Sequence, residues 1–184
     1  MKKTYIYLLF SIMVIAQIAV AGQIVYKYER TIASNNMYKF KTAPIDPNDP
    51  FRGKYIALRY EINSFATTDD DWEYDQKAYV YISKDEDGFA VLETVSKTLL
   101  PNTDFDYIEV DNLNYYSGKV HFELPFNRYY MEESKAYDAE TLAREAQRGD
   151  APATVYAVVH IENNLHVLID IVVNGVSIKE AVAK

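Results

Sequence analysis

The chain begins with a long apolar segment, and no other feature constrains its fold as strongly. Lys2 and Lys3 precede a nearly unbroken apolar run at residues 5–22, in which Gln17 is the only strongly polar side chain. At about 1.5 Å per residue, a helix of this length is close to the thickness of the bilayer hydrocarbon core. Tyrosines lie near both ends of the run, as in headgroup belts: Tyr5, Tyr7, Tyr26 and Tyr28. The pattern predicts a transmembrane helix that contacts the lipid bilayer through residues 5–22.

Two fates of this segment are compatible with its sequence. The small residues of Ala19-Val20-Ala21 would allow a signal peptidase to cut after Ala21 and release the remainder as a secreted protein. However, the apolar run is long for a signal peptide, and its helix-compatible sequence continues without a breaker to about Asn36. These features favour a retained signal anchor. Either fate places the two N-terminal lysines in the cytoplasm and exports the rest. The retained anchor predicts a single-pass protein of the cytoplasmic membrane with an extracytoplasmic C-terminal domain.

Composition excludes several classes of protein. Asp and Glu number 27 against 19 Lys and Arg, for a net charge of −8, so the chain lacks the basic surface of a nucleic-acid-binding protein. It contains no cysteine, which excludes disulfides and thiol chemistry. Tyrosine occurs 17 times and favours half-buried strands. We expect no cofactor, no metal and no small-molecule ligand.

Alternating apolar residues predict strands after the anchor. In residues 54–62 the core face comprises Ile56, Leu58, Tyr60 and Ile62. The other expected strands lie at 37–46, in a hairpin at 77–97 that turns at Asp87-Gly88, at 107–110, at 118–126, and in a meander at 153–178 that turns at Asn163-Asn164 and Asn174-Gly175. Residues 64–76 are expected to form a polar loop.

One helix interrupts this pattern, at residues 134–149. Its predicted N-cap is Ser134 or Asp138, and Gly149 is its predicted C′ residue. Leu142, Ala143 and Ala146 form the expected inner stripe. The fold class is therefore mainly β (β-rich α+β): an anchor helix and its extension at 1–35, followed at 36–184 by one mostly antiparallel β domain with a single inserted helix.

Two clusters resemble metal sites at first sight. His160 and His166 flank the predicted Asn163-Asn164 turn, but that register pairs His160 with Val167 and places the two rings on opposite faces, so they cannot converge on zinc. Carboxylates occupy every second position of the acidic loop, at Asp69, Asp71, Glu73 and Asp75. An extended loop spreads them along one edge, which favours a solvated acidic loop over a calcium site. We expect Trp72, in its middle, to cover the core.

The segment APIDPNDPFRGKYIALRY (43–60) is the densest motif of the chain. Asp46 and Asp49 can accept hydrogen bonds from nearby backbone N–H groups, Arg52 can pair with either, and Gly53 permits a sharp turn into the following strand. These residue types favour a rigid structural corner over a ligand site.

This segment resembles the signature of the GDYXXLXY family, bacterial membrane-anchored proteins of unknown function. Lys54 departs from it, because the family has aspartate there. A second segment, FNRYYMEESKAYDAE (126–140), resembles another family pattern, in which an aromatic strand precedes acidic residues and the helix. The positions that match the two patterns are Pro44, Asp46, Pro47, Asp49, Arg52, Gly53, Tyr55, Leu58, Tyr60, Tyr129, Tyr130, Glu132 and Glu133. The resemblance implies membrane anchorage, an extracytoplasmic domain and, as a partner, a multi-spanning membrane protein.

Residue patterns favour a non-enzymatic protein-interaction or structural module of the cell envelope over an enzyme. The chain has no catalytic cysteine, no Gly-x-Ser-x-Gly motif and no glycine-rich phosphate loop. The expected contact surface is loop 44–53 with the neighbouring Tyr55 and Tyr60. The alternative is an envelope hydrolase that uses Asp46, Asp49 or Glu132 together with Arg52.

Overall fold

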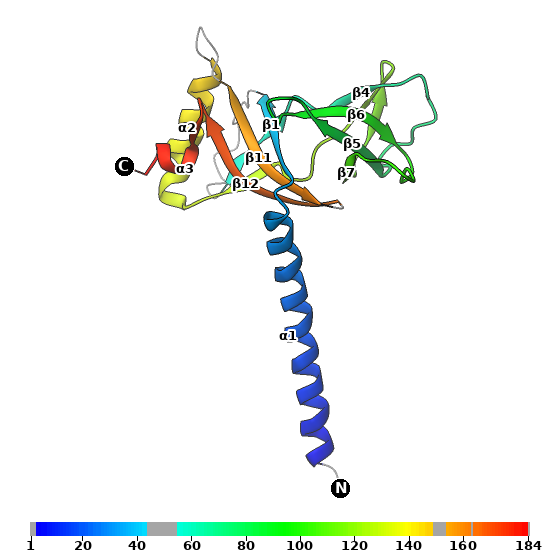
Figure 1. Cartoon of the computed structure of the whole chain (residues 1–184), viewed down its shortest axis with the longest axis vertical. Helices are drawn as coiled ribbons and strands as arrows, with labels where there is room; N and C mark the ends of the chain where they lie inside the picture. Colours follow the sequence, from blue (N-terminus) through cyan, green and yellow to red (C-terminus); the bar gives the residue numbers. More distant parts are fainter. Residues whose placement is uncertain (1–2, 44–54, 149–153, 163, 184) are drawn as a thin grey trace.

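The computed structural model describes residues 3–43, 55–148, 154–162 and 164–183. A single unbroken helix, α1 (Lys3–Ala33), stands away from a β-rich head that starts at Met37 (Figure 1). The chain's N-terminal end lies at the far tip of this helix, whereas its C-terminal end lies on the head beside the last helix. The helix is long and apolar enough to cross a membrane, a property shared by retained anchors and signal sequences. The helix predicted for the apolar run is therefore present in the fold.

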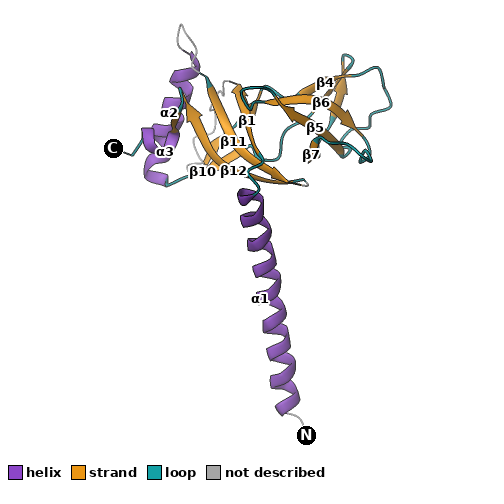
Figure 2. Cartoon of the chain, viewed as in Figure 1, coloured by secondary structure: helices purple, strands orange, loops and turns teal. Residues whose placement is uncertain are grey.

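The head is built from antiparallel strands, which confirms the predicted fold class (Figure 2). Its largest sheet has the order β13-β12-β11-β1-β3, and the smaller ones are β10-β2, β4-β9-β8 and β6-β5-β7. The strands are β1 (Met37–Ala43), β2 (Tyr55–Ala57), β3 (Arg59–Tyr60), β4 (Ser64–Ala66), β5 (Ala78–Lys84), β6 (Ala90–Ser96), β7 (Asp106–Val110), β8 (Asn114–Tyr116), β9 (Lys119–His121), β10 (Arg128–Tyr130), β11 (Val155–Glu162), β12 (Leu165–Val173) and β13 (Val176–Ser177).

Two helices pack beside each other on one side of the head, opposite the β6-β5-β7 sheet (Figure 1). Helix α2 (Glu133–Arg148) is the predicted inserted helix, and the short α3 (Ile178–Ala181), which was not predicted, follows β13. The predicted N-cap was wrong, since Ser134 and Asp138 both lie inside α2. Ala143 and Ala146 of the predicted stripe pack on the core, and the fully buried Ala139 extends that stripe by one turn.

One hydrophobic core joins the four sheets and both head helices. It contains the predicted core face of the signature strand, Ile56, Leu58 and Tyr60, with Ile62 packed against its margin. Strand β11 shows the clearest alternation, since every second residue from Val155 to Ile161 is buried. This strand has hydrogen-bonded partners on both sides, β1 and β12, and its inner face packs in the core.

Three predicted elements differ from the structure. The strand at 54–62 is split into β2 and β3, which pair with different partners. The expected polar loop at 64–76 contributes β4, and the expected strand at 118–126 is reduced to β9, which pairs with the unpredicted β8. In each case tertiary pairing decides which residues are strand, and local alternation does not reveal it.

Candidate functional site

The signature strand changes its partner at Leu58. On one side of this residue, β2 pairs with β10, with Tyr55 opposite Tyr130. On the other side, β3 pairs with β1, with Tyr60 opposite Thr42. The Leu58 N–H donates to the Asn127 carbonyl at 2.8 Å, which ties the transition to the segment before β10. The signature strand therefore joins the two-stranded β10-β2 sheet to the five-stranded sheet.

The C-terminal half of the signature lies in the core. Leu58 and Tyr60 are both buried, and the Tyr60 hydroxyl donates to the Phe126 carbonyl at 2.8 Å. The rings of Tyr60 and Phe126 meet edge to face with centroids 5.2 Å apart, and the Phe40 ring contacts both. Burial raises the pKa of Tyr60 far above its ordinary value, so the hydroxyl keeps the proton that it donates. This half therefore has an architectural role, by which we mean that its side chains pack the core and hold strands together.

In the described N-terminal half of the signature strand, β2, Tyr55 lies on the face away from the core. Tyr55, Arg128 and Tyr130 share one face of the β2–β10 pair, and we call these three residues the aromatic ribbon. The Tyr55 and Tyr130 rings pack with centroids 5.6 Å apart, and the Arg128 guanidinium carbon lies 5.1 Å from the centre of the Tyr55 ring. Tyr130 is 65% exposed, although it is a large aromatic residue. Core packing does not account for its position.

Residues on the opposite face of the β2–β10 pair hold the ribbon on the head. Tyr129 is buried, and its hydroxyl donates to Asp170 Oδ1 at 3.0 Å. Burial and the Asp170 carboxylate raise the Tyr129 pKa, so the phenol stays protonated. The Lys179 ammonium lies 5.4 Å from the centre of the Tyr129 ring. The ribbon is therefore attached to β12 and α3 through Tyr129.

The acidic residues of the second family pattern lie at the start of α2. Glu132 is exposed, and its carboxylate is 3.3 Å from Lys135 Nζ. Hydrogen bonds from Lys135 and from the Ser134 hydroxyl lower the Glu132 pKa. Glu133 is the first residue of α2. The remaining predicted site residues lie outside the described residues: Pro44, Asp46, Pro47, Asp49, Arg52 and Gly53. The proposed hydrolase would depend on that undescribed segment.

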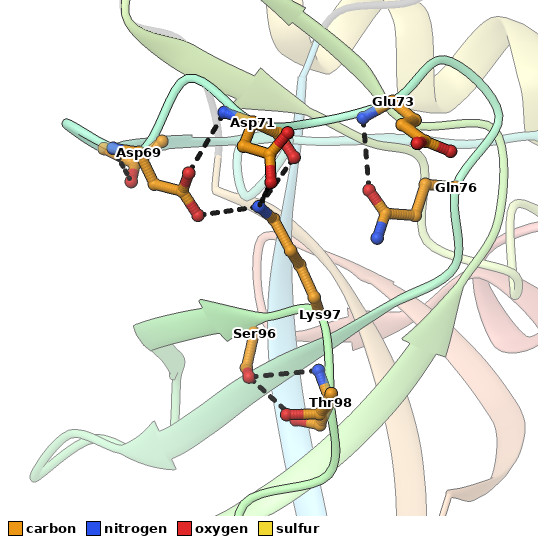
Figure 3. Close-up of polar contacts among 8 residues, drawn as sticks. Asp69, Asp71, Glu73, Gln76, Ser96, Lys97 and Thr98 are labelled. Carbon is orange, nitrogen blue, oxygen red and sulfur yellow. Dashed lines mark hydrogen bonds and ion pairs between the residues drawn. The ribbon is translucent and has the colours of Figure 1, made fainter.

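The acidic loop is organised by a lysine that the sequence pattern did not identify (Figure 3). Lys97 Nζ lies 2.8 Å from the Asp69 carboxylate and 3.8 Å from that of Asp71, and it donates to the Asp71 carbonyl at 2.6 Å. The hydrogen bond from Lys97 is the main cause of a lowered Asp69 pKa. Lys97 also lies 5.0 Å from the centre of the Trp72 ring, which packs against the core as predicted.

The prediction that the acidic residues spread along an edge was therefore wrong for Asp69 and Asp71, because both converge on one ammonium group. Lys97 follows β6, 28 residues after Asp69, so no local signal could have linked the two. Among the residues that the structure describes, no group of three or more His, Cys, Asp or Glu side chains could hold a metal ion.

The histidine register matches the prediction. His160 pairs with Val167 and Ile161 with His166, which places the two histidines on opposite faces of the β11–β12 hairpin. The His166 ring packs on the Phe126 ring with centroids 5.4 Å apart, and burial lowers the His166 pKa. His166 is therefore part of the same packed region as Tyr60.

Sequence reasoning also missed Arg128, although a signal was present. In the segment RYY, residues 128 and 130 lie two positions apart in a strand and therefore share a face. The prediction identified Tyr130 alone, because the stacking of Arg128 on Tyr55 depends on the long-range pairing of β2 with β10.

Comparison with known proteins gives one match. A model of the GDYXXLXY protein family matches residues 17–170, most of the chain. Neither a curated protein nor a solved structure matches it.

Proposed function

The chain belongs to the GDYXXLXY protein family, and from this premise we propose that it is a membrane-anchored interaction module of the bacterial cell envelope. In this proposal α1 is retained in the cytoplasmic membrane with its N-terminus in the cytoplasm. The head lies on the extracytoplasmic side and binds a protein partner without catalysing a reaction. The partner that we propose is a multi-spanning protein of the same membrane.

The length and exposure of α1 support the anchoring role. At about 1.5 Å per residue, the 31 residues of the helix exceed the thickness of a hydrocarbon core. Its large apolar side chains from Tyr5 to Val25 are exposed, so they make no core contacts within the chain. Lipid would remove these side chains from water. Tyr26 and Tyr28 would then lie at the interface next to the head.

The observation that carries the interaction role is the aromatic ribbon. Tyrosine and arginine are enriched among the residues that dominate binding energy at protein interfaces, because they combine a large contact area with polar groups. Tyr55 and Tyr130 present stacked rings, and Arg128 adds a guanidinium group to the same surface. The buried Tyr129 on the opposite face fixes their backbone. A preorganised aromatic surface loses little conformational entropy on binding.

Photo-crosslinking in native membranes tests this role. A photoreactive amino acid replaces Tyr130 in one variant and Tyr74 in the control, since Tyr74 is 82% exposed and lies in the acidic loop, outside the ribbon. We expect position 130 to yield a discrete crosslinked species, identified by mass spectrometry, that position 74 does not yield. An identical set of products from both positions would contradict the proposed contact surface.

Anchorage and topology have a separate test. The intact mass of the membrane-bound protein should include the residues before Ala21, whereas cleavage after Ala21 would shorten it. Because the chain has no native cysteine, a single Lys119→Cys substitution in the head can be labelled selectively. A membrane-impermeant maleimide is added to spheroplasts whose cytoplasmic membrane is intact, and it should label this cysteine. Protection from the reagent would contradict an extracytoplasmic head.

A further inference from the structure

The connection between the anchor and the head is short and hydrogen-bonded. Helix α1 ends at Ala33 and β1 begins at Met37, so Ser34, Asn35 and Asn36 form the whole connection. Asn35 has a φ of 55°, which asparagine tolerates better than most residues. The Met37 N–H donates to the Asn35 carbonyl at 3.0 Å, and the Ser34 hydroxyl donates to the Thr31 carbonyl at 2.7 Å. This geometry is a defined turn, unlike a flexible tether.

Asn36 lies in this turn, and both polar groups of its side chain form hydrogen bonds to residues of the head. Its amide nitrogen donates to the Ile161 carbonyl at 2.8 Å and to Asp106 Oδ2 at 2.5 Å, and its amide oxygen accepts from Lys84 Nζ at 2.7 Å. These partners belong to β11, β7 and β5. The Asn36 carbonyl also accepts from the Ile161 N–H at 3.1 Å. One residue thus links the end of the anchor to two separate sheets.

Contacts of residues next to Asn36 strengthen the connection between α1 and the head. The Tyr38 hydroxyl donates to the same Asp106 oxygen at 2.6 Å, and Lys84 Nζ lies 4.4 Å from the centre of the Tyr38 ring. In the last turn of α1, Thr31 is only 1% exposed, and Arg30 lies 3.5 Å from the Glu162 carboxylate. The helix end therefore packs directly on the β11–β12 hairpin.

We infer that residues 34–38 form a rigid joint that holds the head in one orientation on its anchor. A flexible tether would leave its polar groups in water, whereas here the Asn36 side chain is bonded to three strands distant in sequence. With α1 in a bilayer, the joint presents the aromatic ribbon at one height above the membrane. The inference concerns orientation alone and holds whatever the ribbon binds.

Spin-label distance measurements on the full chain in phospholipid nanodiscs test the joint. The absence of native cysteine allows one label on the helix, at Tyr28→Cys, and one on an exposed strand position of the head, at Val91→Cys. We expect a single narrow distance distribution between the two labels. Insertion of Gly-Ser-Gly after Asn35 should broaden it severalfold, because the insertion separates helix and head while leaving every head residue in place.

Asn36→Asp tests the proposed chemistry of the joint. The change is nearly isosteric, but it removes both N–H donors and places a carboxylate beside Asp106, so we expect a distribution close to that of the insertion variant. Asn63→Asp is the matched control, since the Asn63 side chain donates within the head, to the Tyr60 carbonyl at 3.3 Å. It should keep the narrow distribution.

Either of two results would overturn the inference. One is an unmodified joint whose distribution is as broad as that of the insertion variant. The other is Asn36→Asp with a natively folded head, judged by near-ultraviolet circular dichroism, that retains the narrow distribution. Loss of a Tyr130 crosslink would affect only the proposed partner surface, so the two proposals can fail independently.

Discussion

Tyr55 and Tyr60 lie five residues apart in one signature segment, yet they occupy opposite environments. Tyr60 is buried among Phe40 and Phe126 and donates its hydroxyl to a backbone carbonyl. Tyr55 stacks with the exposed Tyr130 and lies beneath the guanidinium group of Arg128. The period-two alternation of strand side chains separates them, and the exchange of strand partners at Leu58 gives each half its own surroundings.

This contrast separates two reasons why residues can belong to one motif. Leu58 and Tyr60 are buried in the core of the head, so we expect them to matter for folding, whereas Tyr55 contributes to a surface that we expect folding not to require. The sequence of the signature alone suggests that all its residues serve one role. The predictions below test whether its two halves have different effects when they are altered.

The largest effect is expected from Leu58→Ala. Leu58 is buried where the strand changes partner, so truncation should lower the free energy of unfolding of the head by about 2–5 kcal/mol. The single tryptophan, Trp72, packs against the core, so urea unfolding of the full chain in detergent can be followed by its fluorescence. A loss below about 1 kcal/mol would show that the C-terminal half is not architectural.

Tyr60→Phe is a finer test of the same half. The ring and its packing remain, but the Phe126 carbonyl loses the hydroxyl that now donates to it. We expect a destabilisation of about 1 kcal/mol in the same urea assay. Tyr74→Phe is the matched control because Tyr74 is exposed, and its stability should equal that of the unchanged protein.

The pH dependence of stability should report on His166, which packs against Phe126 in the architectural half. Burial lowers its pKa in the folded state below the ordinary value of 6.5, so the unfolded chain takes up the proton first as the pH falls. Stability should therefore decrease as the pH drops below 6.5 and until the lower folded pKa is passed. His166→Gln should flatten the slope of unfolding free energy against pH in this window. An unchanged slope would remove His166 as its source.

The smallest effect on folding is expected from Tyr130→Ala. Because its side chain is mostly exposed, the free energy of unfolding should change by less than about 0.5 kcal/mol. Urea unfolding again provides the measurement. A loss above about 1 kcal/mol would place Tyr130 with Tyr60 as an architectural residue and remove the contrast between the two halves.

Local sequence patterns predicted much of this fold. The apolar run indicated α1, and alternation indicated β1, β5, β6, β7, β11 and β12. The two-residue loop after Glu162 was sufficient to predict the β11–β12 register next to the turn. That register shifts farther along, between Val158 and Val159, where a β-bulge interrupts the pairing. Turn length sets register only until such an irregularity occurs.

The site was less predictable, because its key contacts join distant segments. Asn36 and Asp106 are separated by 70 positions, and Lys97 lies 28 positions after Asp69. Arg128 reaches Tyr55 only through the pairing of β10 with β2. None of these pairs has a spacing that a helix or a hairpin would reveal. They exist because the core brings four sheets together.

The sequence by itself determined the features whose energetics are local or depend on composition. A run of apolar residues needs no partner in the chain to favour a lipid-compatible helix, and alternation needs only one buried face to define a strand. Tertiary structure alone decided that the signature strand splits at Leu58 and that Asn36 links the end of α1 to two sheets. Those outcomes depend on strand pairing and on polar groups that find partners only after the core has assembled. They therefore produce no periodic pattern in the amino-acid sequence.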